Sequence, residues 1–415
     1  MNATMGVRIF LVLALLIGAA IGTTPVTAQV PAAAPPARAP GIAVMTRTGS
    51  TLVAVTLVIP SGSADDPDSI PGAARLVGET IAQAVRWRLD PDAAQLELRV
   101  ERGWTAFTLL ATPEVWVRSW AVVEDVAFRV SLADAPLEAA RKAMLEEFTF
   151  ETGAPVREFA REMYYVLGGA RSPWSRDPRG TQASVRRAPS ASLERSREGR
   201  YRIAQSVAAV VGPVSEQEAR AALAPIGAGP LDPPRSNGPA WERGERVPLQ
   251  RDVTNTWIGA AFPAPRDLPR TQLEFVGYQI QEALTPSPPD PGVFSVLVRV
   301  EDTPPGPVLV VEAAVMPEVT EAWEKRILGA VERLGEQVDE TFFRWQRRRF
   351  RSWVLLREGQ PEEAALRMAL DLAREGRVRP LQEELWAIGT TELAKATEDL
   401  EAPRVLVWGP DLSAR

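Results

Sequence analysis

The residues of this chain that could do chemistry are carboxylates and arginines, because the sequence contains no histidine and no cysteine. Arg75 and Glu79 have the i, i+4 spacing of neighbours on one helix face, and Glu146 and Glu147 follow further along the chain. Without imidazole or thiolate groups, the chain lacks the nitrogen and sulfur ligands that usually hold zinc in proteins. Any catalysis by this chain alone would therefore depend on its carboxylates.

A carboxylate-only enzyme is one alternative that the sequence leaves open. Glu146 and Glu147 could do acid–base work together with Asp65 or Asp66, as carboxylate pairs do in glycosidases. Adjacent residues of a helix point in different directions, so we interpret these glutamates as a solvated acidic helix face. Serine catalysis is not indicated, because the chain has no Gly-x-Ser-x-Gly and no lysine in a Ser-x-x-Lys pattern. We predict no catalytic residue, no cofactor and no bound metal.

The first 28 residues have the pattern of a secretory signal peptide. Arg8 precedes an apolar run from residue 9 to residue 21, and residues 26–28 form a small-residue cleavage site. Residues 29–41, rich in Ala and Pro, are predicted to be a spacer. The apolar run is shorter than the roughly 20 residues that cross a bilayer, so an uncleaved signal is the only membrane anchor left open. We expect an exported protein, periplasmic or secreted.

The charge of the chain argues against nucleic acid as a partner, because its formal net charge is −6 and nucleic-acid-binding domains are usually basic. Residues 344–351 are basic and aromatic, but helical spacing puts Phe343, Arg347 and Phe350 on one stripe. We interpret this segment as a solvated face over a core, with contact to an acidic partner subunit as the alternative. The tryptophans could form core or line a peptide or glycan groove.

Short apolar strands alternate with amphipathic helices in a pattern that occurs twice, which predicts two similar domains. Each half ends with an apolar strand and Gly-Pro, at residues 207–213 and 405–410. Residues 225–248 are dense in Pro and Gly and are predicted to be a linker. We therefore assign residues 42–224 to an N-terminal domain and residues 249–415 to a C-terminal domain, each of mixed α/β structure. The apolar runs predict strands at residues 52–59, 95–100, 104–111, 255–262, 293–300 and 308–315.

The segment from Gly72 to Thr80, Gly-Ala-Ala-Arg-Leu-Val-Gly-Glu-Thr, follows a strand and an acidic turn. It resembles the signature of the inverted zincins, the family of pitrilysin, insulinase and the mitochondrial processing peptidase. In that family a helix carries His-x-x-Glu-His, in which the histidines bind zinc and the glutamate is the general base. The corresponding positions here are Arg75, Gly78 and Glu79. Residues 141–148 resemble the segment that supplies the third zinc ligand, with Glu147 in the ligand's place.

The resemblance implies a fold of two tandem similar domains, each a mainly antiparallel sheet packed with helices, with a degenerate zinc site in the first. It also implies a non-catalytic protein that pairs with a zinc-bearing paralogous peptidase and helps to enclose an extended peptide. A stand-alone homodimer that holds peptides without cutting them is the alternative.

Two further residues become candidates for contact with substrate or partner through the same resemblance. In some bacterial pairs the degenerate subunit grips substrate with an arginine and a tyrosine of its second domain. Arg299 lies roughly where that arginine would fall, but no tyrosine lies around Val308. Arg171 or Ser172 replaces the histidine of a His-Pro-Tyr-Gly region further along the first domain.

Arg75 has two interpretations. The simpler is a helix-surface ion pair with Glu79, worth about 0.3 to 0.5 kcal/mol. The sharper is that its guanidinium takes the place of the metal and bridges Glu79 and Glu147, because a buried carboxylate without a cation is costly. A structure that separates Arg75 from Glu147 would exclude the bridge.

Overall fold

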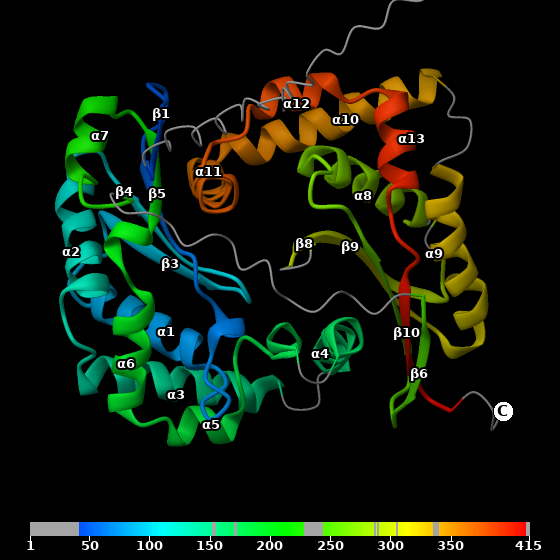
Figure 1. Ribbon diagram of the computed structural model, residues 1–415, viewed down its shortest axis with the longest axis horizontal. Coiled ribbons are helices and arrows are strands. Elements are labelled where there is room, and N and C mark those ends of the chain that lie inside the picture. Colours follow the sequence, from blue (N-terminus) through cyan, green and yellow to red (C-terminus); the bar gives the residue numbers. More distant parts are fainter. Residues whose placement is uncertain are drawn as a thin grey trace, which may run out of the picture. The chain divides into compact units, whose positions relative to one another are not determined.

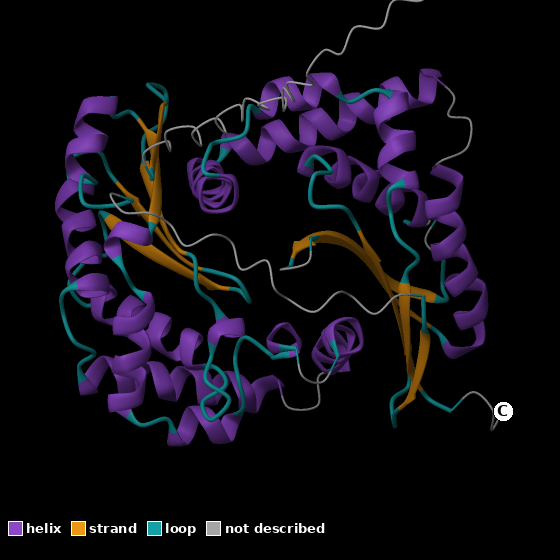
Figure 2. Ribbon diagram, in the orientation of Figure 1, coloured by secondary structure: helices purple, strands orange, loops and turns teal. Residues whose placement is uncertain are grey.

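The computed structural model describes residues 41–151, 155–169, 172–227, 244–285, 288, 290–303, 306–334 and 340–411. These residues form two five-stranded sheets with helices packed around them (Figure 1, Figure 2). The predicted signal peptide and spacer lie almost entirely outside the described residues, and so does Arg171.

The first sheet has the strand order β1-β5-β2-β4-β3. Its strands are β1 (Ile42–Thr46), β2 (Val53–Ile59), β3 (Ala94–Val100), β4 (Thr105–Ala111) and β5 (Val207–Gly212). Only β1 and β5 pair in parallel, and the other neighbours are antiparallel. All seven side chains of β2 are buried, which explains its continuous apolar sequence, because both faces of this central strand are covered.

The helices of the first half follow the strands in chain order. They are α1 (Ala73–Arg86), α2 (Trp116–Phe128), α3 (Asp134–Glu151), α4 (Pro155–Gly168), α5 (Gln182–Arg187), α6 (Ser190–Arg200) and α7 (Glu216–Ala222). The apolar stripe of α1, with Leu76, Val77 and Ile81 among its members, enters a core that also contains Trp116 and Trp120 of α2. This stripe leaves Arg75 and Glu79 on the outer face of α1.

The second sheet repeats the topology of the first, with the order β6-β10-β7-β9-β8 and one parallel pair, β6 with β10. Its strands are β6 (Arg246–Gln250), β7 (Thr256–Pro263), β8 (Val293–Asp302), β9 (Pro307–Val315) and β10 (Arg404–Gly409). The helices are α8 (Arg270–Leu284), α9 (Thr320–Leu334), α10 (Glu340–Gly359), α11 (Pro361–Glu375), α12 (Leu381–Ala387) and α13 (Thr390–Glu398). The predicted fold class, two similar mixed α/β halves with mainly antiparallel sheets, is confirmed.

Each half of the chain supplies one helix to the sheet of the other half, as the positions of α11 and α4 in Figure 1 indicate. Helix α11 packs on the first sheet through small side chains such as Ala364, Ala365 and Ala369. Helix α4 packs on the second sheet, where Phe159 and Met163 are buried against Trp408. A Cβ atom on Gly259 of β7 would lie 2.6 Å from the sulfur of Met163, so this close approach requires glycine. The exchange joins both halves into one compact unit, Ala39–Arg415.

Two strands, β1 and β6, were not predicted from the sequence. They pair in parallel with the closing strands β5 and β10. Strand β6 begins at Arg246, inside the range predicted to be linker. Its Pro248 hid the strand pattern, but proline is tolerated here because β6 is an edge strand. In the described residues, no helix combines the length and the apolar character that a membrane crossing needs.

Candidate functional site

Helix α1 begins at a fixed position, because Asp66 and Gly72 determine its start. The buried carboxylate of Asp66 accepts hydrogen bonds from the backbone N–H groups of Gly72, at 2.7 Å, and Ala74, at 2.8 Å. Gly72 has a φ of 89°, and a Cβ atom there would meet the backbone of Arg179 at 2.4 Å. The acid that could have been half of a catalytic pair is therefore a cap for α1, which orients Arg75 and Glu79.

Arg75 lies between two carboxylates from different helices. Its Nε donates to Glu79 Oε1 at 2.9 Å, and its Nη2 lies 3.7 Å from Oε2 of Glu147 on α3. Arg86 of α1 and Arg157 of α4 flank the same carboxylates, at 3.9 Å from Glu79 and 3.7 Å from Glu147. The predicted bridge from Glu79 through Arg75 to Glu147 is thus present. The three side chains are 19 to 32% exposed, so the bridge is partly open to solvent.

Gly78 stands where the resemblance places the general base, and its missing side chain is used for packing. A Cβ atom on Gly78 would lie 3.2 Å from both terminal methyl groups of Leu98 and 3.3 Å from a methyl group of Val100. Both residues belong to β3, so the bare face of α1 lets the edge strand approach closely. A larger side chain at this position would require the methyl groups of Leu98 and Val100 to shift.

These residues do not fit a zinc ion. The position between Glu79 and Glu147 already holds a guanidinium, and no imidazole or thiolate is available in the chain. The part of the chain that the structure describes contains no group of three or more acidic side chains placed to hold a metal. Glu146, the neighbour of Glu147, is 58% exposed and lies 3.9 Å from Lys142.

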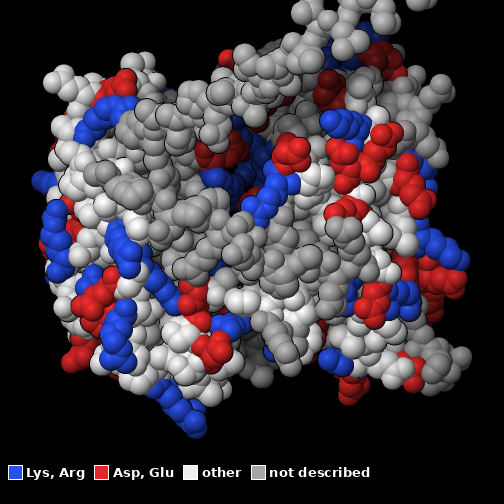
Figure 3. Space-filling model, viewed as in Figure 1, with Lys and Arg blue, Asp and Glu red and all other residues white. Residues whose placement is uncertain are grey.

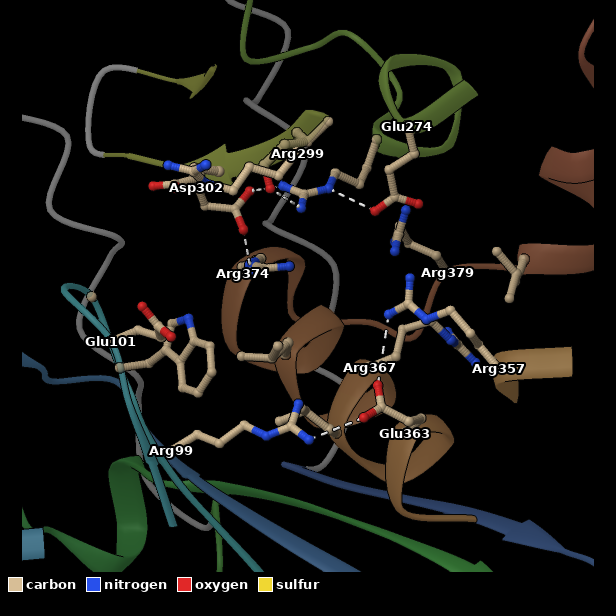
Figure 4. Close-up of a pocket in the computed structure, with 18 of the residues that line it drawn as sticks. Arg99, Glu101, Glu274, Arg299, Asp302, Arg357, Glu363, Arg367, Arg374 and Arg379 are labelled. Atoms are coloured by element: carbon tan, nitrogen blue, oxygen red, sulfur yellow. Dashed lines mark hydrogen bonds and ion pairs between the residues drawn. The ribbon is translucent and has the colours of Figure 1, made fainter. Parts of the chain in front are cut away.

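A cavity of about 370 Å³ lies between the ends of the two edge strands, β3 and β8, and is bordered by α8, α10 and α11 (Figure 4). From β3 and the turn after it come Arg99, Glu101 and Arg102, and from β8 come Arg299, Glu301 and Asp302. Figure 4 shows Arg374 and Arg367 of α11 pointing into the same space.

The sequence itself carries a signal for this cavity, a short segment that is repeated in the two halves. Arg99-Val100-Glu101 and Arg299-Val300-Glu301 are the same tripeptide at the end of equivalent edge strands. Because the topology of the sheet is repeated, both copies reach the same cavity. Aligning the two halves pairs these copies, whereas the motifs considered above singled out only Arg299.

The charges around the cavity are organised by carboxylates that each hold two arginines. Asp302 pairs with Arg270 and Arg374, Glu363 with Arg99 and Arg357, and Asp371 with Arg367 and Arg379. Burial by itself would raise the pKa of Asp302, but Arg270, Arg374 and Arg379 outweigh it and hold that pKa below its ordinary value. The cavity wall is therefore an ion-pair network that joins β8, α8 and α11.

Arg299 lies on β8 and lines this cavity, but it is already engaged. Its guanidinium pairs with Glu301 and, at 2.7 Å, with Glu312 of β9. Burial would lower the pKa of Arg299, but these two carboxylates raise it above its ordinary value. The sequence has no tyrosine around Val308, yet Tyr164 of α4 lies close to this site, within reach of Glu301. Helix α4 brings it from the first half of the chain.

Glu101 connects the cavity with the Arg75 cluster. Burial raises the pKa of Glu101, the nearby charge of Glu301 raises it further, and Arg102, Arg99 and Arg75 oppose these effects. Arg75 is therefore close enough to act on a carboxylate of the cavity wall. Arg75 and the charged cavity wall are thus linked electrostatically through Glu101.

The basic and aromatic segment at residues 344–351 lies on α10. Phe343 and Phe350 are buried, which confirms the predicted core stripe. Trp345 and Trp353 are 48% and 42% exposed, and arginines lie over their rings. Other tryptophans, such as Trp408, are fully buried, so this residue type occurs both in the core and on the surface.

No family model matches the sequence, and no curated protein is significantly similar to it. The fold, in contrast, is similar to solved structures. A protease from Helicobacter pylori has a TM-score of 0.73 at 12% identity, over 89% of this chain and 98% of the other. A peptidase M16 inactive domain from Pseudomonas fluorescens has a TM-score of 0.73 at 15% identity, over 89% and 95%. The periplasmic protease PqqL from Escherichia coli has a TM-score of 0.66 at 13% identity, over 89% of this chain and 44% of that one. The chain therefore has the two-domain fold of M16 peptidase-like proteins, as the resemblance to the pitrilysin family implied.

Proposed function

We propose that this chain is an exported, non-catalytic homologue of zinc metallopeptidases that serves as the supporting subunit of a heterodimeric peptidase. In this role it helps to enclose and bind extended peptides, and the partner subunit carries the zinc and the chemistry. The observation that carries the proposal is the position of Arg75, whose guanidinium lies between Glu79 and Glu147 where the resemblance places a metal ion.

The packing around Gly78, as well as the residue types, supports a loss of catalysis in this chain. The base position is Gly78, and the side chains of Leu98 and Val100 approach its bare face. A glutamate at this position would first have to shift these methyl groups, which lie 3.2 to 3.3 Å from where its Cβ atom would be. A fold similar to that of an inactive M16 domain is consistent with such a role.

The cavity supports the peptide-binding part of the proposal. It lies between two edge strands and offers many charged groups in a space of about 370 Å³, a volume within the usual range of ligand sites. Arg299, proposed as a substrate contact, faces this space, although two carboxylates already hold it. Export is supported by the signal-like residues 1–28 and by the likeness of the fold to a periplasmic protease.

The test is to purify the mature chain and measure bound zinc and peptide hydrolysis, alone and with a zinc-peptidase paralogue from the same source. The proposal expects no zinc and no hydrolysis in the lone chain and a gain of activity in the mixed sample. Hydrolysis by the lone chain that is lost in Glu147→Gln would instead support the carboxylate-only enzyme. A paralogue that is fully active without this chain, combined with peptide binding by a homodimer of this chain, would favour the stand-alone binder.

A further inference from the structure

We infer that the cavity between β3 and β8 binds a carboxylate group, so that the peptides enclosed by this protein are acidic ones. The inference rests on the proposed peptide-binding function and specifies its substrate class. It comes from the balance of charges around the cavity and from two arginines of its wall.

The cavity is more basic than the protein that contains it. Eight arginines and six carboxylates line it, whereas the whole chain has a formal net charge of −6. On the face drawn in Figure 3, blue side chains gather in the hollow near its centre. The lining thus has two more positive than negative side chains, and an excess of one sign of charge in a concave site attracts ligands of the opposite sign.

Arg374 has fewer carboxylate partners than Arg270, which pairs with Asp302 and Glu274, and Arg379, which pairs with Asp371, Glu375 and Glu384. Within the described residues Arg374 makes one ion pair, with Asp302, and Asp302 also pairs with Arg270. Burial lowers the pKa of Arg374 and the charge of Arg270 lowers it further, so that Asp302 does not make up the difference. Its side chain is 31% exposed and points into the cavity (Figure 4). A second carboxylate arriving there would complete the environment of this guanidinium.

Arg102 provides a second, independent cation from the other half of the chain. It makes no ion pair within the described parts of the molecule. Its Nε donates to the backbone carbonyl of Trp174 at 2.8 Å, and its guanidinium carbon lies 3.2 Å from the centre of the Tyr164 ring. Stacking on an aromatic ring fixes the plane of a guanidinium and leaves its outer N–H groups able to donate.

The remaining arginines of the network are already held by other carboxylates, so Arg374 and Arg102 are the donors that an incoming anion would meet. Glu363 and Asp371 each hold two guanidiniums already, at distances between 2.7 and 3.6 Å. An incoming anion therefore meets donors that are in place, and it does not have to break the network. Pre-positioned donors reduce the ordering cost of binding.

The experiment measures binding of fluorescent peptides to the mature chain by anisotropy, alone and with the zinc-bearing partner. One peptide pair differs by internal Glu against Gln, and a second pair by a free C-terminal carboxylate against an amide, so the two sources of the carboxylate are separated. We expect the acidic member of at least one pair to bind about tenfold more tightly, as one charge-assisted hydrogen bond would give. This preference should shrink when salt is raised.

Variants then locate the preference in the cavity. Arg374→Gln and Arg102→Gln should each remove most of the preference for the acidic peptide, and Arg374→Lys should keep part of it. The matched control is Arg344→Gln on α10, whose side chain is 61% exposed and lines no part of the cavity. It should bind like the unmodified chain.

The outcomes separate the two proposals. Peptides that bind without regard to charge, or a preference unchanged by both glutamine variants, overturn the inference and leave peptide binding intact. Absence of binding to every peptide, with and without the partner, overturns the proposed function together with the inference. Thermal unfolding of each variant shows whether the fold is retained, and Arg102 and Arg374 lie in different halves, so loss of fold in one leaves the other as a test.

Discussion

Replacing Arg75 and Glu79 together by histidine should give this chain a zinc site. The two positions are four residues apart on the outer face of α1, and the Arg75 guanidinium now fills the space in front of Glu147. Removing that side chain opens the space, and two imidazoles with one carboxylate are a recognised set of zinc ligands. The variant should bind zinc without hydrolysing peptides, because Gly78 supplies no general base.

The magnitude follows from the linkage between binding and folding. Free zinc at about 100 times its dissociation constant would stabilise the folded state by about 2.7 kcal/mol. The exchanged helices α4 and α11 should make both halves unfold together as one unit, Ala39–Arg415. An unfolding entropy of about 2.1 cal/mol/K per residue then gives about 0.8 kcal/mol/K for the whole unit. Zinc should therefore raise the melting temperature by about 3 °C, a shift that scanning fluorimetry detects.

Two controls make this result specific. Glu147→Gln in the double-histidine background should abolish the zinc-dependent shift. The pair Glu321→His and Lys325→His places two histidines at the same spacing on α9, where the native side chains are 84% and 76% exposed. This pair should show a much smaller shift if a third ligand is required. A folded double-histidine variant of α1 that does not bind zinc would refute the geometry assigned to positions 75, 79 and 147.

Three other predictions follow from the packing and the charge network. Phe159→Ala removes a fully buried ring from the contact between α4 and the second sheet, and should lower the unfolding free energy by about 3 to 5 kcal/mol in denaturant titrations. Asp302 has a lowered pKa, so its contribution to stability is present above the ordinary pKa of 3.8 and is lost as the pH falls below that value. The substitution Asp302→Asn should therefore flatten the decline of melting temperature in this acid range. An unchanged pH profile of melting temperature would contradict the ion-pair network. Gln281 of α8 covers the outer edge of β8, since its side chain accepts a hydrogen bond from the Val298 N–H at 2.8 Å and donates one to the Val296 carbonyl at 3.2 Å. The substitution Gln281→Ala should lower the free energy of unfolding by about 1 kcal/mol and increase aggregation measured by light scattering.

The sequence predicted the strands and the repeated architecture well, because each sheet is built from local apolar runs of the right length. It did not predict β1 and β6, whose pairing depends on strands about 160 residues away for both (β5 and β10). The exchange of α4 and α11 between the halves was also out of reach. Both helices are amphipathic, and amphipathic spacing identifies a buried face without identifying which sheet buries it.

In the candidate site, too, some residues could be identified from the sequence and others only from the fold. Arg75, Glu79 and Glu147 could be named from sequence because two of them share a helix turn and the third was located by resemblance. Most of the cavity could not, because its members come from β3, β8, α8 and α11, which are far apart in the chain. Tyr164 illustrates the difficulty, since only the crossing of α4 to the second sheet brings it near Arg299 and Glu301.

Arginine is the residue type that makes this arrangement possible. A guanidinium has five N–H donors in one plane and can satisfy two carboxylates at once, as Arg75 does with Glu79 and Glu147 and Arg299 does on β8. An ammonium group is a compact charge that cannot match paired carboxylates in this way, and no lysine is among the described residues that line the cavity. The same property that lets Arg75 pair with carboxylates of two helices therefore lets the cavity carry a dense set of charges in fixed positions. We expect arginine-to-lysine substitutions in this wall to weaken the network although they conserve charge.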